Sequence, residues 1–290
     1  MRRLPRTSLT AMAVILFRVT RVLAADDCSD PSNDCVAIGH WNFSMALGAG
    51  IRTNPVAHGT DIPLVVLPQF SYYGKRVFIE NLDLGVTLAE DNTHTLSLIA
   101  SPGYDRVFFY RSDLQNIFIG GLPGSGNGSA GGAIAGGATT GSTGQTVPTP
   151  FPSRTRHITY LAGPEWTFKY RRMSGQVDLL HEITGRNHGD EIRAALALPV
   201  IESRNSLTAS LGLTWKSAAI VNYYYGAANI YRGGSAVNPF VKLGYTRQWT
   251  HQWRLTALAQ YELLGNAIAD SPIVAQRYVA TVFAGASYEF

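Results

Sequence analysis

The chain has 290 residues, of which 46% are hydrophobic, 11% are aromatic and 15% are charged. Five of its 24 Lys and Arg residues, but none of its 20 acidic residues, lie in residues 1–25. Without that segment 19 basic side chains stand against 20 acidic ones, so net charge provides no basis for binding nucleic acid. With two cysteines and no histidine pair at ligand spacing, the sequence indicates no zinc site.

The amino-terminal segment has the pattern of a secretory signal peptide. Arg2, Arg3 and Arg6 precede an apolar run over residues 9–17, and small residues follow at 24–25. We expect residues 1–24 to be removed, with cleavage after Ala24 or Ala25. Residues 25–40 then form a short periplasmic segment.

That periplasmic segment contains both cysteines, Cys28 and Cys35. An oxidising compartment favours a disulfide between them, and two free thiols are the alternative.

The remaining chain alternates between apolar and polar residues. No apolar run reaches 18 residues, which excludes membrane-spanning helices. Between 206 and 216 the odd positions are apolar, as at Leu207, Leu211 and Trp215, while the even positions include Ser210 and Lys216. Such segments recur, and their length of about ten residues suits a tilted strand crossing a bilayer. A soluble sandwich would carry more charge, so we predict an antiparallel transmembrane β-barrel over 41–290.

The number of strands follows from the segments that alternate. Eleven are visible, at 41–51, 62–73, 76–90, 94–111, 156–171, 173–185, 190–201, 206–221, 237–249, 252–264 and 278–290. A barrel with both ends in the periplasm needs an even number. Splitting the third segment at Asn81 gives about 12 strands, and ten is the alternative.

Residues 112–155 break the pattern, because they are rich in Gly, Ser and Pro. Such a composition cannot bury a core, so we expect a long loop, placed outside the cell because long loops in these barrels are extracellular. The Gly-rich residues 222–236 are expected to form a second surface loop. The glycines of 120–144 lack the Lys-Ser/Thr ending of a phosphate-binding loop.

The chain ends on an alternating strand with Tyr288 and Phe290 on its apolar face. Aromatic residues form girdles at the membrane interfaces of such barrels. In bacteria a last strand that ends on Phe is also the signal read by the barrel-assembly machinery. We therefore expect Tyr288 and Phe290 to serve as the assembly signal.

The face opposite the apolar one carries charges of both signs. The candidate lumen-lining residues are Glu165, Lys169, Lys216, Lys242, Arg254 and Glu262, together with Arg171, Asp178, Glu182, Glu191 and Arg193. A mixed lumen favours ion pairs across the barrel that narrow the pore, and a small aqueous channel is the alternative. No pattern joins a histidine to a nucleophile. We expect no enzymatic activity, cofactor or metal.

The carboxy-terminal half resembles the MipA/OmpV family of MltA-interacting outer-membrane proteins. Two motifs carry the resemblance, Tyr223-Tyr224-Tyr225-Gly226 after an asparagine and Asp270-Ser271-Pro272 before an isoleucine. Residues 238–240, 261–264 and 286–290 support it, and 47–50, 67–70 and 96–98 fit more loosely. The Gly/Ser insert and the cysteine pair depart from the family pattern.

The resemblance implies a scaffold in the bacterial outer membrane, because the namesake of the family bridges a lytic transglycosylase and a murein synthase. Other members are described as porin-like, adhesive or linked to antibiotic response. The expected partners are outer-membrane lipid, the barrel-assembly machinery and periplasmic murein enzymes. A small porin-like channel is the alternative function.

Overall fold

A computed structural model of the chain describes residues 38–110 and 155–290. Its elements are β1 (Trp41–Arg52), β2 (Ile62–Tyr73), β3 (Val77–Glu80), β4 (Asp83–Glu90), β5 (His94–Pro102), the 3-10 helix η1 (Tyr104–Phe108), β6 (Tyr160–Tyr170), β7 (Met173–Glu182), β8 (Asp190–Ile201), β9 (Asn205–Lys216), α1 (Ala218–Tyr225), β10 (Ala236–Gln248), β11 (Trp253–Leu263), α2 (Asn266–Ala269) and β12 (Tyr278–Glu289). The signal peptide, Cys28, Cys35 and most of the long loop lie outside the described residues.

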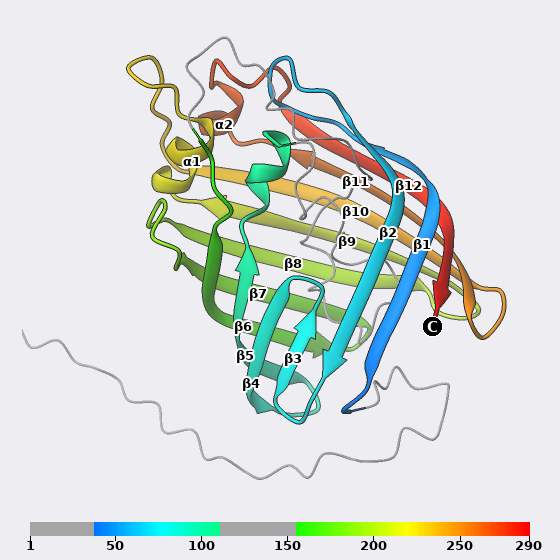
Figure 1. The fold of residues 1–290 in the computed structure, drawn as a ribbon. Helices are drawn as coiled ribbons and strands as arrows, with labels where there is room; N and C mark the ends of the chain where they lie inside the picture. Colours follow the sequence, from blue (N-terminus) through cyan, green and yellow to red (C-terminus); the bar gives the residue numbers. More distant parts are fainter. Residues whose placement is uncertain (1–37, 111–154) are drawn as a thin grey trace, which may run out of the picture.

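The strands form one closed antiparallel barrel in which each strand pairs with its neighbours in sequence, and β1 pairs with β12 (Figure 1). The described residues thus contain twelve strands, which confirms the expected fold and strand number. Strands can cross a bilayer only when their backbone groups are paired, and closure pairs both edges of the sheet. None of the helices in the described ranges is long and apolar enough to span a membrane.

The seam between β1 and β12 depends on two glycines. Gly48 lies opposite Gly285 in the register. A Cβ on Gly48 would stand 2.3 Å from the carbonyl oxygen of Ala284, and one on Gly285 would stand 2.4 Å from that of Leu47. Only glycine permits this close approach of the first and last strands.

The division of the third alternating segment occurs at Asn81, as expected. Asn81 has φ +54°, a conformation that asparagine adopts more readily than most residues. Its backbone N–H donates to the carbonyl of Phe70 at 2.8 Å, and its side-chain oxygen accepts from the Phe70 N–H at 3.1 Å. Asn81 therefore pairs the backbone N–H and C=O groups of Phe70 in β2 at the point where the four-residue β3 ends.

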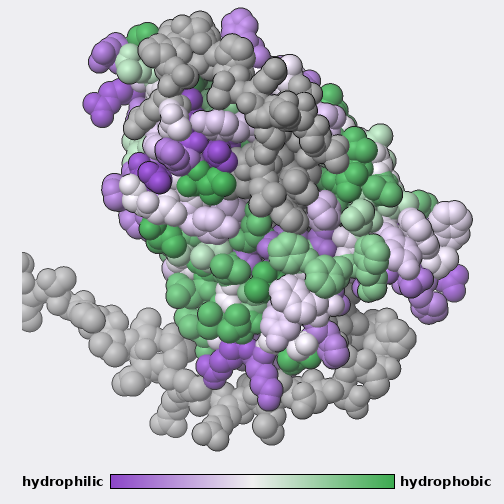
Figure 2. Space-filling model, in the orientation of Figure 1, coloured by the Kyte–Doolittle hydropathy of each residue, from purple (hydrophilic) through white to green (hydrophobic). Residues whose placement is uncertain are grey.

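The outer surface of the wall is apolar. Outward-facing side chains such as Leu47, Val86, Leu211 and Val241 are about half exposed. In Figure 2 hydrophobic residues, drawn in green, form a band over the strands between the more polar ends of the barrel on the face in view. Aromatic residues border the band at one end of the barrel, with Trp41 opposite Tyr72 and Trp253 opposite Tyr288. This is the surface that a lipid-embedded barrel requires.

The two ends of the barrel differ. At one, called the turn end, the connections are short: residues 74–76, 91–93, 171–172, 202–204 and 249–252. The start of β1 and the carboxyl terminus lie there too (Figure 1). The opposite end, called the helix end, carries η1, α1 and α2 in longer connections. The strand predictions for 94–111 and 206–221 were too long, because these segments leave the wall at Pro102 and Lys216.

The helix end contains the main apolar core. Inward-facing wall residues, including Leu64, Leu161, Leu258 and Phe283, cluster with Phe108, Phe109, Ile220, Tyr224, Tyr225, Leu264, Ile268 and Ile273 from the connections. The three helices and their flanking residues therefore form a plug, defined as residues 104–109, 218–225 and 264–273, whose apolar side chains are buried against the inner wall.

The two faces of β9 provide a test of the membrane assignment. Leu211 is 59% exposed on the apolar belt, whereas Thr208 faces inward opposite Gly244. We expect Leu211→Arg to reduce the free energy of unfolding by about 2–4 kcal/mol, because it places a charge in lipid near mid-membrane. Thr208→Arg should cost much less. Urea unfolding of both variants in lipid vesicles measures this, and a larger loss for Thr208→Arg would contradict the assignment of the faces.

Candidate functional site

The first motif of the family resemblance forms the end of α1. Its three tyrosines are buried, and each hydroxyl has a partner outside the helix. Tyr223 accepts from the backbone N–H of His157 at 2.9 Å, and the Tyr224 hydroxyl lies 2.9 Å from Oγ1 of Thr159. The hydroxyl of Tyr225 donates to Oδ1 of Asp105 at 2.8 Å. The run therefore joins α1 to η1 and to the residues that lead into β6.

The second motif contacts the first. Ser271 follows α2 and is 2% exposed, and its hydroxyl donates to the backbone carbonyl of Tyr225 at 2.6 Å. Asp270 pairs with Arg277 at 2.5 Å on the surface. Gly226 ends α1 where a Cβ would lie 2.4 Å from the carbonyl oxygen of Asn222. Two motifs far apart in sequence thus build one plug.

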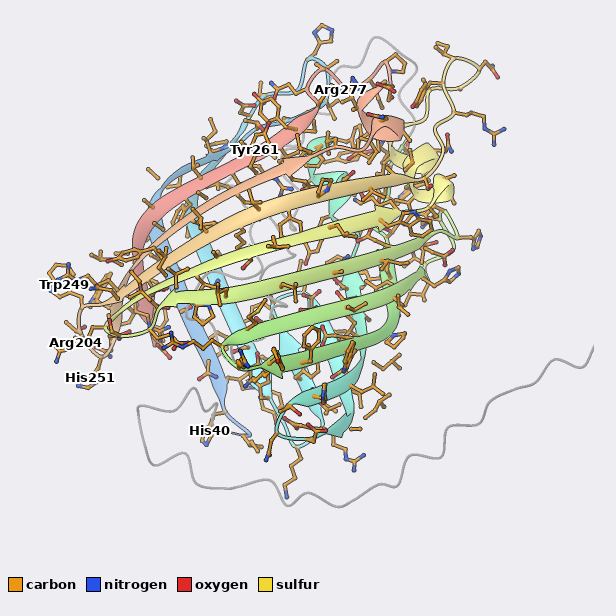
Figure 3. The ribbon with its side chains drawn as sticks, turned by 180° about the vertical axis from the view of Figure 1, so that it is seen from behind. His40, Arg204, Trp249, His251, Tyr261 and Arg277 are labelled. Atoms are coloured by element: carbon orange, nitrogen blue, oxygen red, sulfur yellow. The ribbon has the colours of Figure 1, made fainter. Side chains whose placement is uncertain are left out.

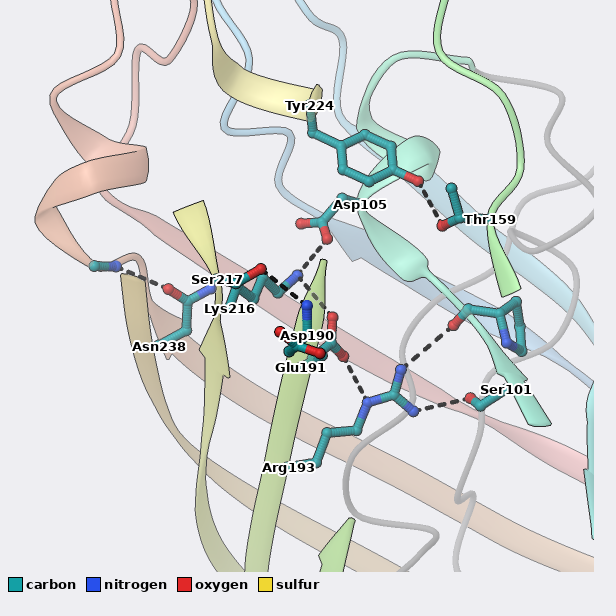
Figure 4. A network of polar contacts seen from close by, with 12 residues as sticks. Ser101, Asp105, Thr159, Asp190, Glu191, Arg193, Lys216, Ser217, Tyr224 and Asn238 are labelled. Carbon is teal, nitrogen blue, oxygen red and sulfur yellow. Dashed lines mark hydrogen bonds and ion pairs between the residues drawn. The ribbon is translucent and has the colours of Figure 1, made fainter. Parts of the chain in front are cut away.

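A buried ionic network lies beneath the plug and attaches it to the wall (Figure 4). The ammonium of Lys216, at the end of β9, pairs with Asp105 of η1 and lies 3.9 Å from Oε2 of Glu191. Nε of Arg193 donates to Oε1 of Glu191 at 2.6 Å. Nη1 of Arg193 also donates to Oγ of Ser101 at 2.8 Å.

The network fixes the position of η1. Asp105 is 3% exposed and binds both Lys216 and Tyr225. A buried charge that loses its partner is strongly destabilising, typically by 3–5 kcal/mol. Removing either partner of Asp105 should therefore loosen the plug from the wall.

Tyr225 is held in its donor form. Burial, with the nearby Asp105 carboxylate, raises its pKa well above the usual value. The phenol therefore stays neutral at physiological pH and continues to donate to Asp105.

The structure places the sequence-predicted lumen residues in different surroundings. Lys216 is part of the network, and Glu262 lines the same cavity. Glu165 accepts from Nε2 of Gln176 at 2.8 Å, and Arg254 pairs with Glu289 near the turn end. Lys242 is 5% exposed. Lys169 is exposed.

Two of the further charges assigned to the lumen do not act there. Glu182 instead closes the connection between β7 and β8, accepting from the backbone N–H groups of Thr184, Arg186, Asn187 and His188. Arg171 lies exposed in a turn with φ +55°. The alternation of apolar and polar residues does not identify side chains that no longer follow strand geometry where a strand ends.

The residues of the expected assembly signal lie at the turn end. The rings of Tyr288 and Phe290 pack edge to face at 4.9 Å, and the backbone N–H of Phe290 donates to the carbonyl of Phe43 at 2.9 Å. Phe290 is 75% exposed. Its role as a signal stays a prediction.

Sequence reasoning missed Arg52, Tyr104 and Asp105, although all three line the cavity beneath the plug. Arg52 ends β1 on the inward face and could have been found by continuing the alternation by one residue. Asp105 comes two residues after the sequence Ser101-Pro102-Gly103, whose proline and glycine are a sign that the strand ends before it.

One arrangement at the helix end resembles part of a hydrolase site. Nδ1 of His181 lies 2.7 Å from Oδ1 of Asp190 on the surface. Ser217 is near, but its hydroxyl accepts from the backbone N–H of Asp190, and no hydrogen bond joins it to His181 in the described residues. Within the same ranges no group of three or more His, Cys, Asp or Glu side chains could hold a metal ion.

A closed barrel with a lipid-facing belt and buried charges on part of its inner face defines the class of this protein, a transmembrane β-barrel. A family model described as MltA-interacting protein MipA matches residues 47–290. The chain therefore belongs to the MipA family, which confirms the resemblance, and it is an outer-membrane β-barrel protein.

Individual relatives are more distant. The MltA-interacting proteins of Escherichia coli (strain K12) and Shigella flexneri are each 23% identical over 94 residues, covering 29% of this chain and 38% of the relative. Among solved structures, OmpT of Vibrio cholerae covers 86% of this chain and 97% of its own at 11% identity, with a TM-score of 0.33. The outer membrane channel DcaP of Acinetobacter baumannii covers 86% of this chain and 72% of its own at 12% identity, with a TM-score of 0.34.

The bond between Tyr225 and Asp105 provides a direct test of the plug. Tyr225→Phe removes a donor to a buried carboxylate, and we expect it to lower the free energy of unfolding by about 1.5–3 kcal/mol. Tyr231→Phe is the matched control. Its hydroxyl donates to the carbonyl of Ala267 at 3.0 Å in a half-buried position, so its loss should be about 0.5–1.5 kcal/mol. Denaturant unfolding in detergent micelles measures both, and equal losses would contradict the assigned role of Asp105.

Proposed function

We propose that this protein is an outer-membrane scaffold that binds periplasmic murein enzymes at its turn end. The observation that carries the proposal is the plug. Apolar side chains of η1, α1 and α2 fill the helix end and are tied to the wall by buried hydrogen bonds and ion pairs. A barrel packed in this way suits a structural role better than wide solute passage.

The orientation of the barrel belongs to the same proposal. Bacterial barrels have short turns on the periplasmic side and longer loops outside. We therefore place the turn end in the periplasm and the helix end, with the connection that includes residues 112–155, at the cell surface.

The turn end has the chemistry of a docking surface for an acidic partner. Its exposed basic residues outnumber its exposed acidic ones, with Lys75, Arg76, Arg171, Arg172, Arg204 and Arg247 against Glu90, Asp91 and Glu202. Trp249 is 73% exposed at the tip of the β10–β11 turn. In Figure 3, Arg204, Trp249 and His251 lie together at this end, away from Arg277. Arginine and tryptophan are enriched where proteins bind tightly.

Binding of a purified lytic transglycosylase to the barrel in nanodiscs tests the proposal. We expect saturable binding that weakens as salt is raised. The pair Arg171→Glu and Arg172→Glu should weaken it at least tenfold. The pair Arg232→Glu and Arg277→Glu, which changes the same charge at the helix end, should leave it unchanged. Absence of saturable binding at low salt would refute the scaffold role, and equal effects of the two pairs would refute the docking surface.

Planar bilayer recording separates the scaffold from the alternative channel. A barrel whose helix end is filled by a packed plug should show no steady conductance steps. Regular steps from the purified, folded protein would instead support the porin-like function.

A further inference from the structure

The strongest unexplained feature of the structure is Arg52. Its side chain is 5% exposed, yet neither Nε nor Nη1 has a hydrogen-bond partner. The guanidinium carbon lies 4.8 Å from the centre of the Phe108 ring, which covers one face of the group. Buried donors are nearly always satisfied, so an unpaired buried guanidinium points to a bound water or ligand.

Arg52 faces a cavity of about 50 Å³ beneath the plug. At the roughly 10–15 Å³ that one water requires, this space accommodates about three to five water-sized atoms. Glu262 lines the same cavity, and its Oε1 accepts from Nδ2 of Asn238 at 3.0 Å. No cation of the described residues lies within ion-pair distance of its carboxylate. Arg52 and Glu262 are thus opposite charges that share a cavity without direct contact.

The other charges of the cavity are already paired. Lys216 binds Asp105, and Arg193 binds Glu191. With Arg52 and Glu262 included, the described lining residues carry three positive and three negative formal charges.

This balance selects the ligand class. A simple anion on Arg52 would bring a net negative charge into a buried site beside Glu262, and a simple cation on Glu262 would bring a net positive one beside Arg52. Both are costly at low dielectric. A small zwitterion adds no net charge and satisfies both groups.

We propose that this cavity binds a small zwitterion of the α-amino acid class, with its carboxylate on Arg52 and its ammonium group on Glu262. Glycine, with five non-hydrogen atoms, matches the space. The site goes beyond the scaffold role and does not depend on it, because it lies beneath the plug rather than on the turn-end surface.

Isothermal titration of the purified barrel in detergent micelles tests the proposal with three probes: glycine, acetate and methylammonium. Glycine should bind saturably and at least tenfold more tightly than either of the others. This ranking needs no variant, so it stands even if a substitution prevents folding. Failure of all three probes to bind would mean that water alone fills the cavity, and a preference for acetate or methylammonium would overturn the zwitterion.

Two substitutions then assign the contacts. Arg52→Met should weaken glycine binding at least tenfold, and Glu262→Gln should reverse the preference so that acetate binds more tightly than glycine. Arg277→Met, which alters an exposed arginine at the helix end, is the control and should change neither. Glycine binding that survives both cavity substitutions would overturn the proposal. Transglycosylase binding to the turn end is measured separately, so failure of one proposal leaves the other intact.

Discussion

The structure depends on one constraint, the need to pair every backbone N–H and C=O group within lipid. Closure of the sheet between β1 and β12 meets it, and the Gly48–Gly285 pair permits the approach of the two strands. Once the barrel is closed, strand alternation separates an apolar outer face from an inner face. The side chains of the inner face then determine what the protein can do.

The inner face of the wall is mixed near the helix end. Buried charges lie on strand residues that meet the plug, where Lys216, the last residue of β9, holds Asp105. Apolar side chains continue further into the barrel, with Leu258 and Phe283 in the same core as Tyr224. Apolar burial stabilises the plug, while the ion pairs and the Tyr225 hydrogen bond restrict it to one position. Both contributions act on η1, which connects the wall to α1.

Much of the fold could be predicted from the sequence, because lipid outside the wall imposes an alternation of apolar and polar residues that is visible along each strand. The turn at Asn81 and the extents of β8 and β12 followed from that pattern. The plug could not be predicted in the same way. Residues 218–225 directly follow an alternating strand and end in tyrosines, which occur in strands and helices alike. Inward-facing apolar residues such as Leu258 indicate that something packs against them, but they do not indicate which segment it is.

The candidate site was less predictable than the wall. The partners of Asp105 lie 111 and 120 residues away in sequence, and no local pattern joins them. The resemblance of the motifs to the family marked Tyr225 and Ser271, but only the fold explains why they occur together. Their hydrogen bond joins α1 to the segment that follows α2.

The plug that closes the helix end should be as ordered as the wall. Hydrogen–deuterium exchange of the intact barrel in lipid measures this directly. We expect the amides of residues 222–225, in the last turn of α1, to exchange as slowly as those of β10, because the helix opens only when the core beneath it does. Exchange of α1 as fast as that of the exposed turn at residues 249–252 would contradict it.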